Sequence, residues 1–236
     1  MKGKLIIIES GSDGSGKATQ SEYLYNRLIK DNIKVRKVEF PNYKSEASAL
    51  VKMYLRGDFG KDPSDVSPYI ASTFFTVDRY ASYKKDWEEF YKDGGIIISD
   101  RYTTSNMVHQ ASKFSTKKEK DDFLDWLWDF EFNLYGLPVP DKVFFLDMPV
   151  EFTKKLTFNR KNKITGEKEK DIHESNRKYL DTTYDNGVYI AKKYGWERVE
   201  CIENDKVKTI REISDFIYDS AISLINDNGD GDKLGN

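Results

Sequence analysis

Short, uninterrupted apolar segments recur along the chain, and long amphipathic stretches separate them. Four such segments stand out, at residues 5–8 (LIII), 96–98 (III), 143–146 (VFFL) and, more weakly, 198–202 (RVECI). An unbroken apolar run is typical of a strand that helices cover on both faces, as in parallel sheets. Residues 34–40 (KVRKVEF) alternate before Pro41 and give a fifth candidate strand. The pattern predicts an α/β fold with a mostly parallel, five-stranded sheet flanked by helices.

The length of the chain bounds its domain organisation. A chain of 236 residues can bury a substantial core within one large α/β domain. Apolar residues at helical spacing between Ile210 and Leu224 predict a C-terminal helix that packs on the sheet. We therefore expect a single domain over residues 1–225 and a polar, flexible tail over residues 226–236.

The balance of charge and the use of cysteine argue against several classes of protein. There are 38 Lys and Arg residues against 40 Asp and Glu residues, whereas proteins that grip a nucleic-acid backbone usually have a strongly basic face. Cys201 is the only cysteine, which rules out an intrachain disulfide and suits a reducing compartment. The apolar run at 5–8 is too short for a signal peptide, and no stretch approaches the roughly 20 apolar residues that span a bilayer. We expect a cytoplasmic protein with no nucleic-acid or membrane partner.

A glycine-rich segment follows the first expected strand and has the spacing of a phosphate-binding loop. Gly11, Gly16 and Lys17 fit the pattern G-x-x-x-x-G-K-[ST], and a helix is expected from about Ala18. Glycines let backbone N–H groups turn toward phosphate oxygens, and the helix N-terminus adds partial positive charge. We expect Lys17 to reach a transferred phosphoryl group. The match indicates phosphate binding and leaves the reaction open.

Ala18 stands where such a loop normally has the serine or threonine that coordinates magnesium. The neighbouring Thr19 lies about 100° further around the helix, so its hydroxyl faces a different direction. Two acids are candidate replacements: Asp13 inside the loop and Asp100 at the end of the strand at 96–98. Either acid is alternatively an ordinary cap or turn residue. We expect Mg²⁺ to be held mainly by nucleotide phosphates and water, with Asp13 and Asp100 as its protein ligands.

Two Asp-Arg pairs lie at positions that suit an anionic substrate. Arg101 follows the strand at 96–98, at the edge where open α/β sheets bind ligands, and its planar guanidinium can hold a phosphate through two hydrogen bonds. Phe75 and Arg79 are four residues apart and share a helix face. Together they offer a ring that can stack on a base and a cation that can bond a base oxygen. Without further context, a place in the core is the commoner use of a phenylalanine such as Phe75.

These motifs occur in the order found in the thymidylate kinase family. The segments ESGSDGSGKATQ, EFPNYKS, FFTVDRY, SDRYTTSNMVHQ, FFLDMP and KDIHESN cover nearly the whole chain, which resembles the bacterial type of that family. The family motif D-R-Y-x-x-S-x-x-A-Y-Q is matched by Asp100, Arg101, Tyr102, Ser105 and Gln110. The resemblance implies a P-loop nucleoside monophosphate kinase fold with a short lid, assembled as a homodimer. It also implies transfer of the ATP γ-phosphoryl group to dTMP, giving dTDP, with Mg²⁺ as cofactor.

The resemblance also implies roles for individual side chains. Phe75 is expected to stack on thymine, Arg79 to meet the base oxygen, and Arg101 to hold the monophosphate. Asn106 is expected beside the base, and Asp13 beside the deoxyribose hydroxyl and the metal. The residues implied to bind ATP in the loop are Gly11, Ser12, Asp13, Gly14, Ser15, Gly16, Lys17, Ala18 and Thr19. Those implied to bind the substrate are Asp13, Phe40, Pro41, Tyr43, Phe75, Arg79, Arg101, Ser105, Asn106, His109 and Gln110.

The basic segment 158–171 (FNRKNKITGEKEKD) is, on composition alone, a solvated loop. By resemblance it is the lid, which supplies the catalytic arginine in relatives whose phosphate-binding loop lacks one. Arg160 is the candidate, with Lys161 and Lys163 as alternatives, and it would contact ATP and stabilise charge on the moving phosphoryl group. The catalytic residues expected on this basis are Asp13, Lys17, Arg101 and Arg160.

Departures from the family pattern keep two other functions open. His109 replaces an aromatic residue that lies against the sugar, which bears on the preference for 2′-deoxy substrates. Ser10 replaces a glutamate, and Glu9, one residue earlier, is expected to point to the other side of the strand. The alternatives are a kinase for another nucleotide, deoxynucleotide or deoxynucleoside, and a non-catalytic nucleotide-binding module, which the absence of a hydroxyl at Ala18 suggests.

Overall fold

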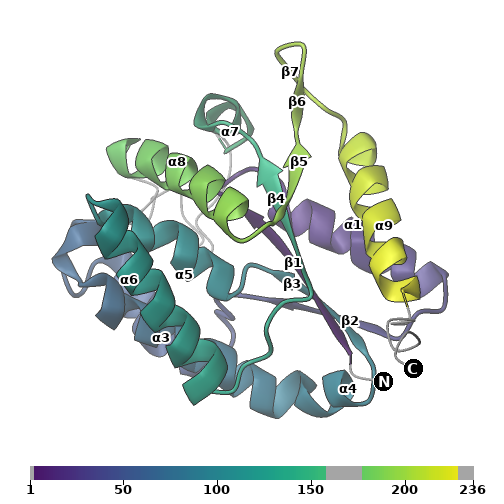
Figure 1. Ribbon diagram of the computed structural model, residues 1–236, viewed down its shortest axis with the longest axis horizontal. Helices are drawn as coiled ribbons and strands as arrows, with labels where there is room; N and C mark the ends of the chain where they lie inside the picture. Colours follow the sequence, from purple (N-terminus) through teal and green to yellow (C-terminus); the bar gives the residue numbers. More distant parts are fainter. Residues whose placement is uncertain (1–2, 158–176, 228–236) are drawn as a thin grey trace, which may run out of the picture.

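A five-stranded parallel sheet forms the centre of the molecule, seen in a computed structural model that describes residues 3–157 and 177–227 (Figure 1). The strands lie in the order β2-β3-β1-β4-β5, and every neighbouring pair is parallel. The predicted fold class is confirmed, and each predicted strand position carries a strand. Their bounds are Lys4–Ser10 (β1), Val35–Glu39 (β2), Ile96–Asp100 (β3), Lys142–Asp147 (β4) and Glu197–Glu200 (β5).

The segment expected as one strand at 198–202 is divided in two. β5 covers its first part, and β6 (Ile202–Glu203) pairs antiparallel with β7 (Lys206–Val207) in a separate hairpin. Asn204 and Asp205 form the two-residue turn of this hairpin, with φ of 49° and 59°. Such left-handed conformations are what a tight hairpin turn requires. Antiparallel pairing in the described residues is thus confined to this projection, and the main sheet is entirely parallel.

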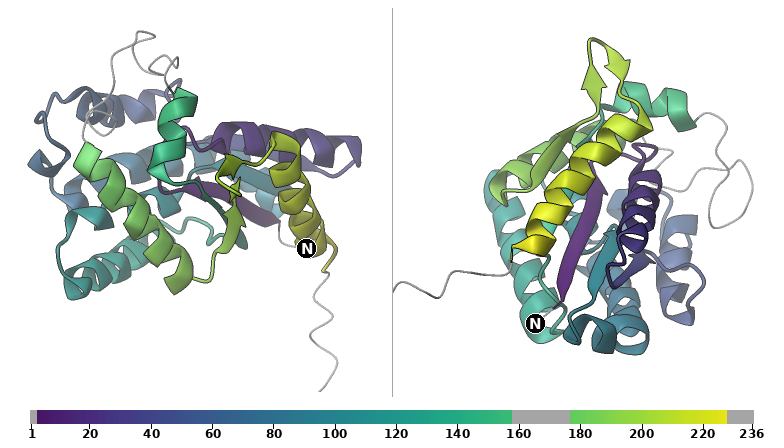
Figure 2. Two further views of the ribbon diagram at one scale, coloured as in Figure 1. Left: turned by 90° about the horizontal axis from the view of Figure 1, so that it is seen from above. Right: turned by 90° about the vertical axis from the view of Figure 1, so that its right-hand side faces the viewer.

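Helices cover both faces of the sheet, as Figures 1 and 2 show. Helices α1 and α9 lie side by side on one face, whereas α5, α6 and α8 lie on the other. The first five helices are Lys17–Lys30 (α1), Ala49–Arg56 (α2), Pro68–Ser82 (α3), Glu88–Lys92 (α4) and Thr103–His109 (α5). The others are Lys117–Trp128 (α6), Val150–Thr157 (α7), Arg177–Lys193 (α8) and Ile210–Asn226 (α9).

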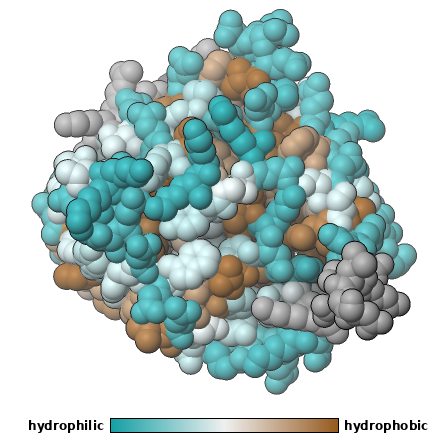
Figure 3. All heavy atoms as spheres, viewed as in Figure 1, coloured by the Kyte–Doolittle hydropathy of each residue, from teal (hydrophilic) through white to brown (hydrophobic). Residues whose placement is uncertain are grey.

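Strand β1 shows why the strands have unbroken apolar sequences. Leu5 and Ile7 pack into the core on the α5–α6 side, whereas Ile6 and Ile8 pack into the core on the α1–α9 side. All four side chains are fully buried, because successive residues of a strand point to opposite faces and helices cover both. On the face drawn in Figure 3, hydrophilic residues cover much of the surface, and hydrophobic residues are visible in patches between them.

The C-terminal helix was predicted correctly and runs slightly further than expected. Thr209 caps α9 through a capping box with Glu212, and the helix continues to Asn226, one residue beyond the predicted end of the domain. Residues 228–236 of the predicted tail lie outside the described residues. Within residues 3–157 and 177–227, no helix is long and apolar enough to cross a membrane.

Candidate active site

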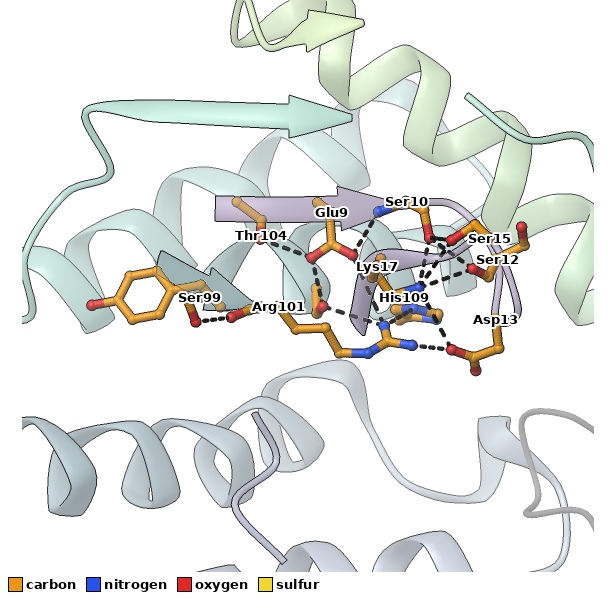
Figure 4. Close-up of polar contacts among 12 residues, drawn as sticks. Glu9, Ser10, Ser12, Asp13, Ser15, Lys17, Ser99, Arg101, Thr104 and His109 are labelled. Atoms are coloured by element: carbon orange, nitrogen blue, oxygen red, sulfur yellow. Dashed lines mark hydrogen bonds and ion pairs between the residues drawn. The ribbon is translucent and has the colours of Figure 1, made fainter. Parts of the chain in front are cut away.

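The predicted phosphate-binding loop connects β1 to α1 at the carboxyl edge of the sheet (Figure 4). Helix α1 begins at Lys17, one residue before the predicted start. Gly16 has φ of 95°, a left-handed conformation that glycine adopts at little cost. Gly11 lies against α8, where an added Cβ would come within 2.7 Å of the Cα of Tyr184. The loop therefore needs its glycines for two reasons, backbone conformation at Gly16 and close packing at Gly11.

Lys17 is buried, and its ammonium group lies among oxygen atoms of the loop. Nζ donates to Ser10 Oγ at 2.6 Å and to the Ser12 carbonyl at 3.0 Å, and it lies 3.7 Å from the Asp13 carboxylate. Burial and the charge of Arg101 lower the pKa of Lys17 from 10.5 to about 8, although nearby carboxylates partly oppose this. The ammonium is thus held at the mouth of the loop, where phosphate oxygens would meet it.

Arg101 follows β3 and extends its guanidinium toward the loop (Figure 4). Nη2 forms an ion pair with Asp13, while Nη1 lies 3.2 Å from Nε2 of His109 and 3.9 Å from the Glu9 carboxylate. Ser105 joins this group, because its Oγ donates to Glu9 at 2.6 Å and lies 3.5 Å from Nη1. The structure therefore brings together four of the predicted substrate-binding residues: Asp13, Arg101, Ser105 and His109.

The backbone and the charge of Arg101 are both unusual. Its φ of 68° lies in the left-handed region, which costs a residue other than glycine about 1–2 kcal/mol. Burial alone would lower the pKa of Arg101, but the carboxylates of Asp13, Glu9 and Asp100 outweigh burial and raise it. The side chain remains 18% exposed. A permanently charged, planar fork is thus held at the edge of the sheet, which suits the binding of an anion.

Asp100 ends β3 and offers a carboxylate oxygen to the site. It is buried, and its Oδ1 has no hydrogen-bond partner among the described residues. A buried carboxylate oxygen in this position fits a Mg²⁺ ion or its bound water. The Asp13 carboxylate is by contrast paired with Arg101. Within residues 3–157 and 177–227, no three His, Cys, Asp or Glu side chains gather in a metal-binding group, so the chain offers this ion few ligands.

Arg79 is buried in α3, where the carboxylate of Glu131 engages its guanidinium. Nε donates to Oε2 at 2.8 Å, Nη2 forms an ion pair with Oε1, and Nη1 lies 3.4 Å from the carbonyl of Tyr102. Asn106 of α5 directs its amide nitrogen at the same carboxylate, 3.2 Å from Oε1. The two residues predicted to read the base, Arg79 and Asn106, are therefore held by one glutamate.

Phe75 and Tyr43 belong to a small hydrophobic cluster around α2 and α3. Phe75 is half-buried, and the ring of Tyr54 meets it edge-on with 6.1 Å between ring centroids. Tyr43 is also half-buried, and it is close enough to Arg101 to contribute to the raised pKa of that residue. Tyr43 therefore lies near Arg101, and Phe75 lies about one helical turn before Arg79 in α3.

Phe40 and Gln110 are two further predicted substrate-binding residues whose side chains are buried. Phe40 belongs to the main hydrophobic core, and its ring lies 6.0 Å from that of Tyr102. Gln110 follows α5 and is only 1% exposed. Pro41, joined to Phe40 by a cis peptide bond, is half-buried. The burial of the Phe40 ring is thus explained by its packing in the hydrophobic core.

Glu9 and Ser10 contact the cationic side chains of the site, and only the orientation of the two residues was predicted from the sequence. Their predicted opposite orientations are confirmed, because Ser10 faces Lys17 whereas Glu9 faces Arg101 and Ser105. Their contacts with these cations were not predicted.

Glu131 was missed entirely, although a glutamate within the aromatic segment 126–132 (WLWDFEF) is a signal of a buried acid with a partner. The predicted lid at 158–171, including Arg160, Lys161 and Lys163, lies outside the described residues.

Comparisons with known proteins agree on one family. A family model described as thymidylate kinase matches residues 8–201. The thymidylate kinase of Plasmodium falciparum (isolate 3D7) is 25% identical over 213 residues, which cover 90% of this chain and 91% of that protein. The thymidylate kinase of Schizosaccharomyces pombe is 31% identical over 147 residues, 62% of each chain. Among solved structures, thymidylate kinase from Candida albicans has the same fold, with a TM-score of 0.70 and 21% identity over 95% of this chain and 94% of that one.

Proposed function

The chain belongs to the thymidylate kinase family, and on that basis we propose that it transfers the γ-phosphoryl group of ATP to dTMP, giving dTDP and ADP. The reaction is a step toward dTTP. One observation of the site carries the assignment of residues: Arg101 is held between Asp13, Glu9 and His109, beside the buried Lys17. This arrangement sets two cations side by side, one for each of two phosphate groups.

The transfer needs positioning and neutralisation of charge more than proton transfer. An oxygen of the dTMP phosphate attacks the γ-phosphorus in line, a P–O bond forms, and the bond to the oxygen bridging the β- and γ-phosphorus breaks so that ADP leaves. Because the attacking oxygen is already anionic, no general base is required. Arg101 would hold the attacking phosphate, and Lys17 would neutralise charge on the transferred group. Arg160, from the proposed lid, would stabilise charge on the same group.

Residues of the loop and of β3 would hold ATP and its magnesium. The loop from Gly11 to Gly16 would direct backbone N–H groups at the phosphates, and Thr19 would follow in the first turn of α1. Bound Mg²⁺ would neutralise charge on the phosphates. Asp100 is the stronger candidate ligand because its Oδ1 has no partner among the described residues, whereas Asp13 is paired with Arg101. Ala18 contributes no side-chain ligand.

The proposed pocket for the base lies between α3 and α5. Phe75 would stack on thymine, and Tyr43 and Asp13 would lie near the phosphate and sugar. Arg79 and Asn106 would meet the polar edge of the base. The buried contacts of Arg79 with Glu131 support this assignment, because they hold the guanidinium in one place.

We also propose that the enzyme works in the cytoplasm as a homodimer. Helix α3 exposes Ile70, Val77 and Tyr80, of which Ile70 is 54% exposed. Residues seven and ten apart lie near one face of a helix, so these three form an apolar stripe that a second copy would cover. The single cysteine suits a reducing compartment. Molar mass from light scattering on a sizing column tests the dimer, and a mass equal to one 27.5 kDa chain contradicts it.

A coupled assay for ADP across several acceptors tests the activity. We expect dTMP to be the best acceptor when dTMP, dUMP, dCMP and thymidine are compared with ATP and excess magnesium. A higher rate with thymidine than with dTMP would indicate a nucleoside kinase and would leave Arg101 without a phosphate to hold. Binding of ATP without transfer to any monophosphate would instead indicate a non-catalytic module.

A further inference from the structure

Glu131 is a fully buried carboxylate that no step of the transfer uses. It lies in a π-helical segment, Asp129–Leu134 (η5), which continues directly from α6. Wide helical turns of this kind are frequent at functional sites. Its two oxygens receive hydrogen bonds from three different side chains, those of Arg79, Thr103 and Asn106. A carboxylate with this many donors serves to fix the orientation of the groups that surround it.

The contacts of Asn106 fix which end of its amide faces the pocket. Its Nδ2 lies 3.2 Å from Glu131 Oε1 and 3.4 Å from the carbonyl of Ser72. Both neighbours are acceptors, so only the NH₂ end of the amide can face them. No described hydrogen bond involves the Oδ1 atom of Asn106. The side chain therefore presents an acceptor, and not a donor, on its other side.

The contacts of Arg79 determine which of its N–H donors remain for a substrate. A guanidinium has five N–H donors. Glu131 takes the N–H of Nε and one of Nη2, and the carbonyl of Tyr102 takes one of Nη1. The second N–H of Nη1 and of Nη2 has no acceptor among the described residues. Arg79 therefore keeps two N–H donors, and it shares the Oε1 atom of Glu131 with Asn106, whose amide oxygen is an acceptor.

We propose that Glu131 is a positioning residue that sets the hydrogen-bond polarity of the base pocket, so that it accepts thymine and rejects cytosine. This inference rests on the proposed function and on the placement of the base beside Arg79 and Asn106. Thymine has a donor at N3 and an acceptor at O4, which match an acceptor on Asn106 and donors on Arg79. Cytosine has an acceptor at N3 and a donor amino group at C4, which oppose both. The carboxylate can act on both residues because each of its oxygens accepts more than one hydrogen bond.

Measurements on the wild-type enzyme test the proposed arrangement of hydrogen-bond donors and acceptors around the base. We expect kcat/KM for dCMP to be lower than for dTMP by about a hundredfold or more, because the wrong base leaves buried polar groups unpaired. dUMP is the control, since it has the same N3 and O4 as dTMP and lacks only the methyl group. If dTMP is phosphorylated but dCMP is used within about threefold of dUMP, the inference fails while the proposed function stands. If dTMP is not phosphorylated, the proposed function itself fails.

Two substitutions test the part that Glu131 plays. Glu131→Gln keeps the length of the side chain but has one acceptor oxygen in place of two. It therefore cannot accept hydrogen bonds at both of the positions that the carboxylate oxygens of Glu131 occupy. Glu131→Asp keeps the charge that Arg79 requires but is one methylene shorter, and it is the second variant to test if Glu131→Gln does not fold. We expect each to lower the ratio of kcat/KM for dTMP to that for dCMP, by about tenfold or more for Glu131→Gln, mainly through a higher KM for dTMP.

Thr103→Val is the matched control in the same buried cluster. Thr103 donates to Oε2 of Glu131 at 2.6 Å, whereas Asn106 contacts the other oxygen, Oε1. We expect this variant to keep the ratio of dTMP to dCMP within about twofold of wild type. A folded Glu131 variant with the wild-type ratio would overturn the inference. An equal loss of discrimination in Thr103→Val would also overturn it, because general loosening of the pocket would then be the cause.

Discussion

Nε2 of His109 lies 3.2 Å from Nη1 of Arg101, and the imidazole ring also lies against the ring of Tyr179. An arginine N–H can only donate, so Nε2 must be the unprotonated nitrogen of a neutral imidazole. His109 is therefore a hydrogen-bond partner of the arginine that we propose holds dTMP. An aromatic ring at this position would pack in the same space but would offer Arg101 no acceptor.

We therefore expect His109→Phe to raise KM for dTMP by about three- to tenfold, which corresponds to the loss of one hydrogen bond of about 1 kcal/mol. The turnover number should change less. His109→Gln is the control, because glutamine can place an acceptor near Arg101. The comparison of dTMP with its ribose counterpart in both variants also measures the preference for the 2′-deoxy sugar. An unchanged KM in His109→Phe would show that the contact does not position Arg101.

Lys17 should take up a proton when ATP binds at alkaline pH. Its pKa in the folded protein is about 8, chiefly because of burial, so above pH 8 much of the side chain is neutral. The negative charge of ATP favours the ammonium form and raises this pKa, and binding is then coupled to proton uptake. Calorimetric titrations near pH 9, where ATP is fully deprotonated, should show uptake approaching about one proton when buffers of different ionisation enthalpy are compared. Near pH 6.5 Lys17 is already charged and should contribute almost no proton, so that any exchange there comes from the phosphate of ATP.

Lys17→Arg is the control for that proton, because an arginine stays charged at both pH values. Lys113, whose pKa burial also lowers to about 8, is present in both proteins and so cancels from the comparison. Equal proton uptake by wild type and Lys17→Arg would assign the proton to another group. The same lowered pKa implies that Lys17 makes folding more favourable as pH rises from about 8 to 10.5, since the unfolded chain then binds more protons.

Asp100→Asn should raise the magnesium concentration needed for half-maximal activity by about tenfold, because an amide oxygen is a weaker ligand than a carboxylate. Excess magnesium should restore part of the activity. Asp147→Asn is a matched control, since Asp147 also ends a central strand but is paired with Arg198 and Tyr184. Ala18→Ser should lower the magnesium requirement by returning a hydroxyl to the loop. A magnesium requirement that Asp100→Asn leaves unchanged would show that Asp100 does not hold the ion.

Arg160→Ala should lower kcat by about a thousandfold while the Kd for dTMP changes little, because the proposed role of this arginine begins only as the phosphoryl group moves. Single-turnover rates and equilibrium binding of dTMP separate the two effects. Lys161→Ala is the neighbouring control in the lid. If kcat is unchanged in Arg160→Ala and reduced in Lys161→Ala, the catalytic cation is the lysine.

Gly11→Ala should destabilise the protein by about 1–3 kcal/mol, because the added methyl group would lie 2.7 Å from the Cα of Tyr184 and the backbone of α8 cannot yield easily. Gly136→Ala is the control: its φ of 65° is unfavourable for alanine, but apart from its chain neighbours no described residue has an atom within 4 Å of the added carbon. Chemical denaturation of both variants measures the two costs. ATP should also bind Gly11→Ala more weakly, since the loop must shift. A free energy of unfolding equal to wild type in Gly11→Ala would show that the contact relaxes freely.

The fold class, the five strand positions and the phosphate-binding loop could all be predicted from the amino-acid sequence. These features are local, since a run such as residues 5–8 is apolar because both faces of one strand are covered, and the spacing from Gly11 to Lys17 reflects a single turn. The division of 198–202 into two strands was not evident, because Asn204 and Asp205, which turn the hairpin, lie after that segment. Thymidylate kinase membership was also evident from the sequence, because it depends on the order of several motifs along the chain.

Which side chains face one another could not be predicted in this way and is seen in the folded protein. Arg101 pairs with Asp13 across 88 residues of sequence, and Arg79 pairs with Glu131 across 52. The physical reason is that parallel strands and their crossover helices bring distant segments to one edge of the sheet, and neither composition nor spacing records these contacts. The buried guanidinium of Arg79 needs a carboxylate partner, because an unpaired buried charge is strongly destabilising. That this partner is Glu131 follows from the fold and not from the local sequence pattern.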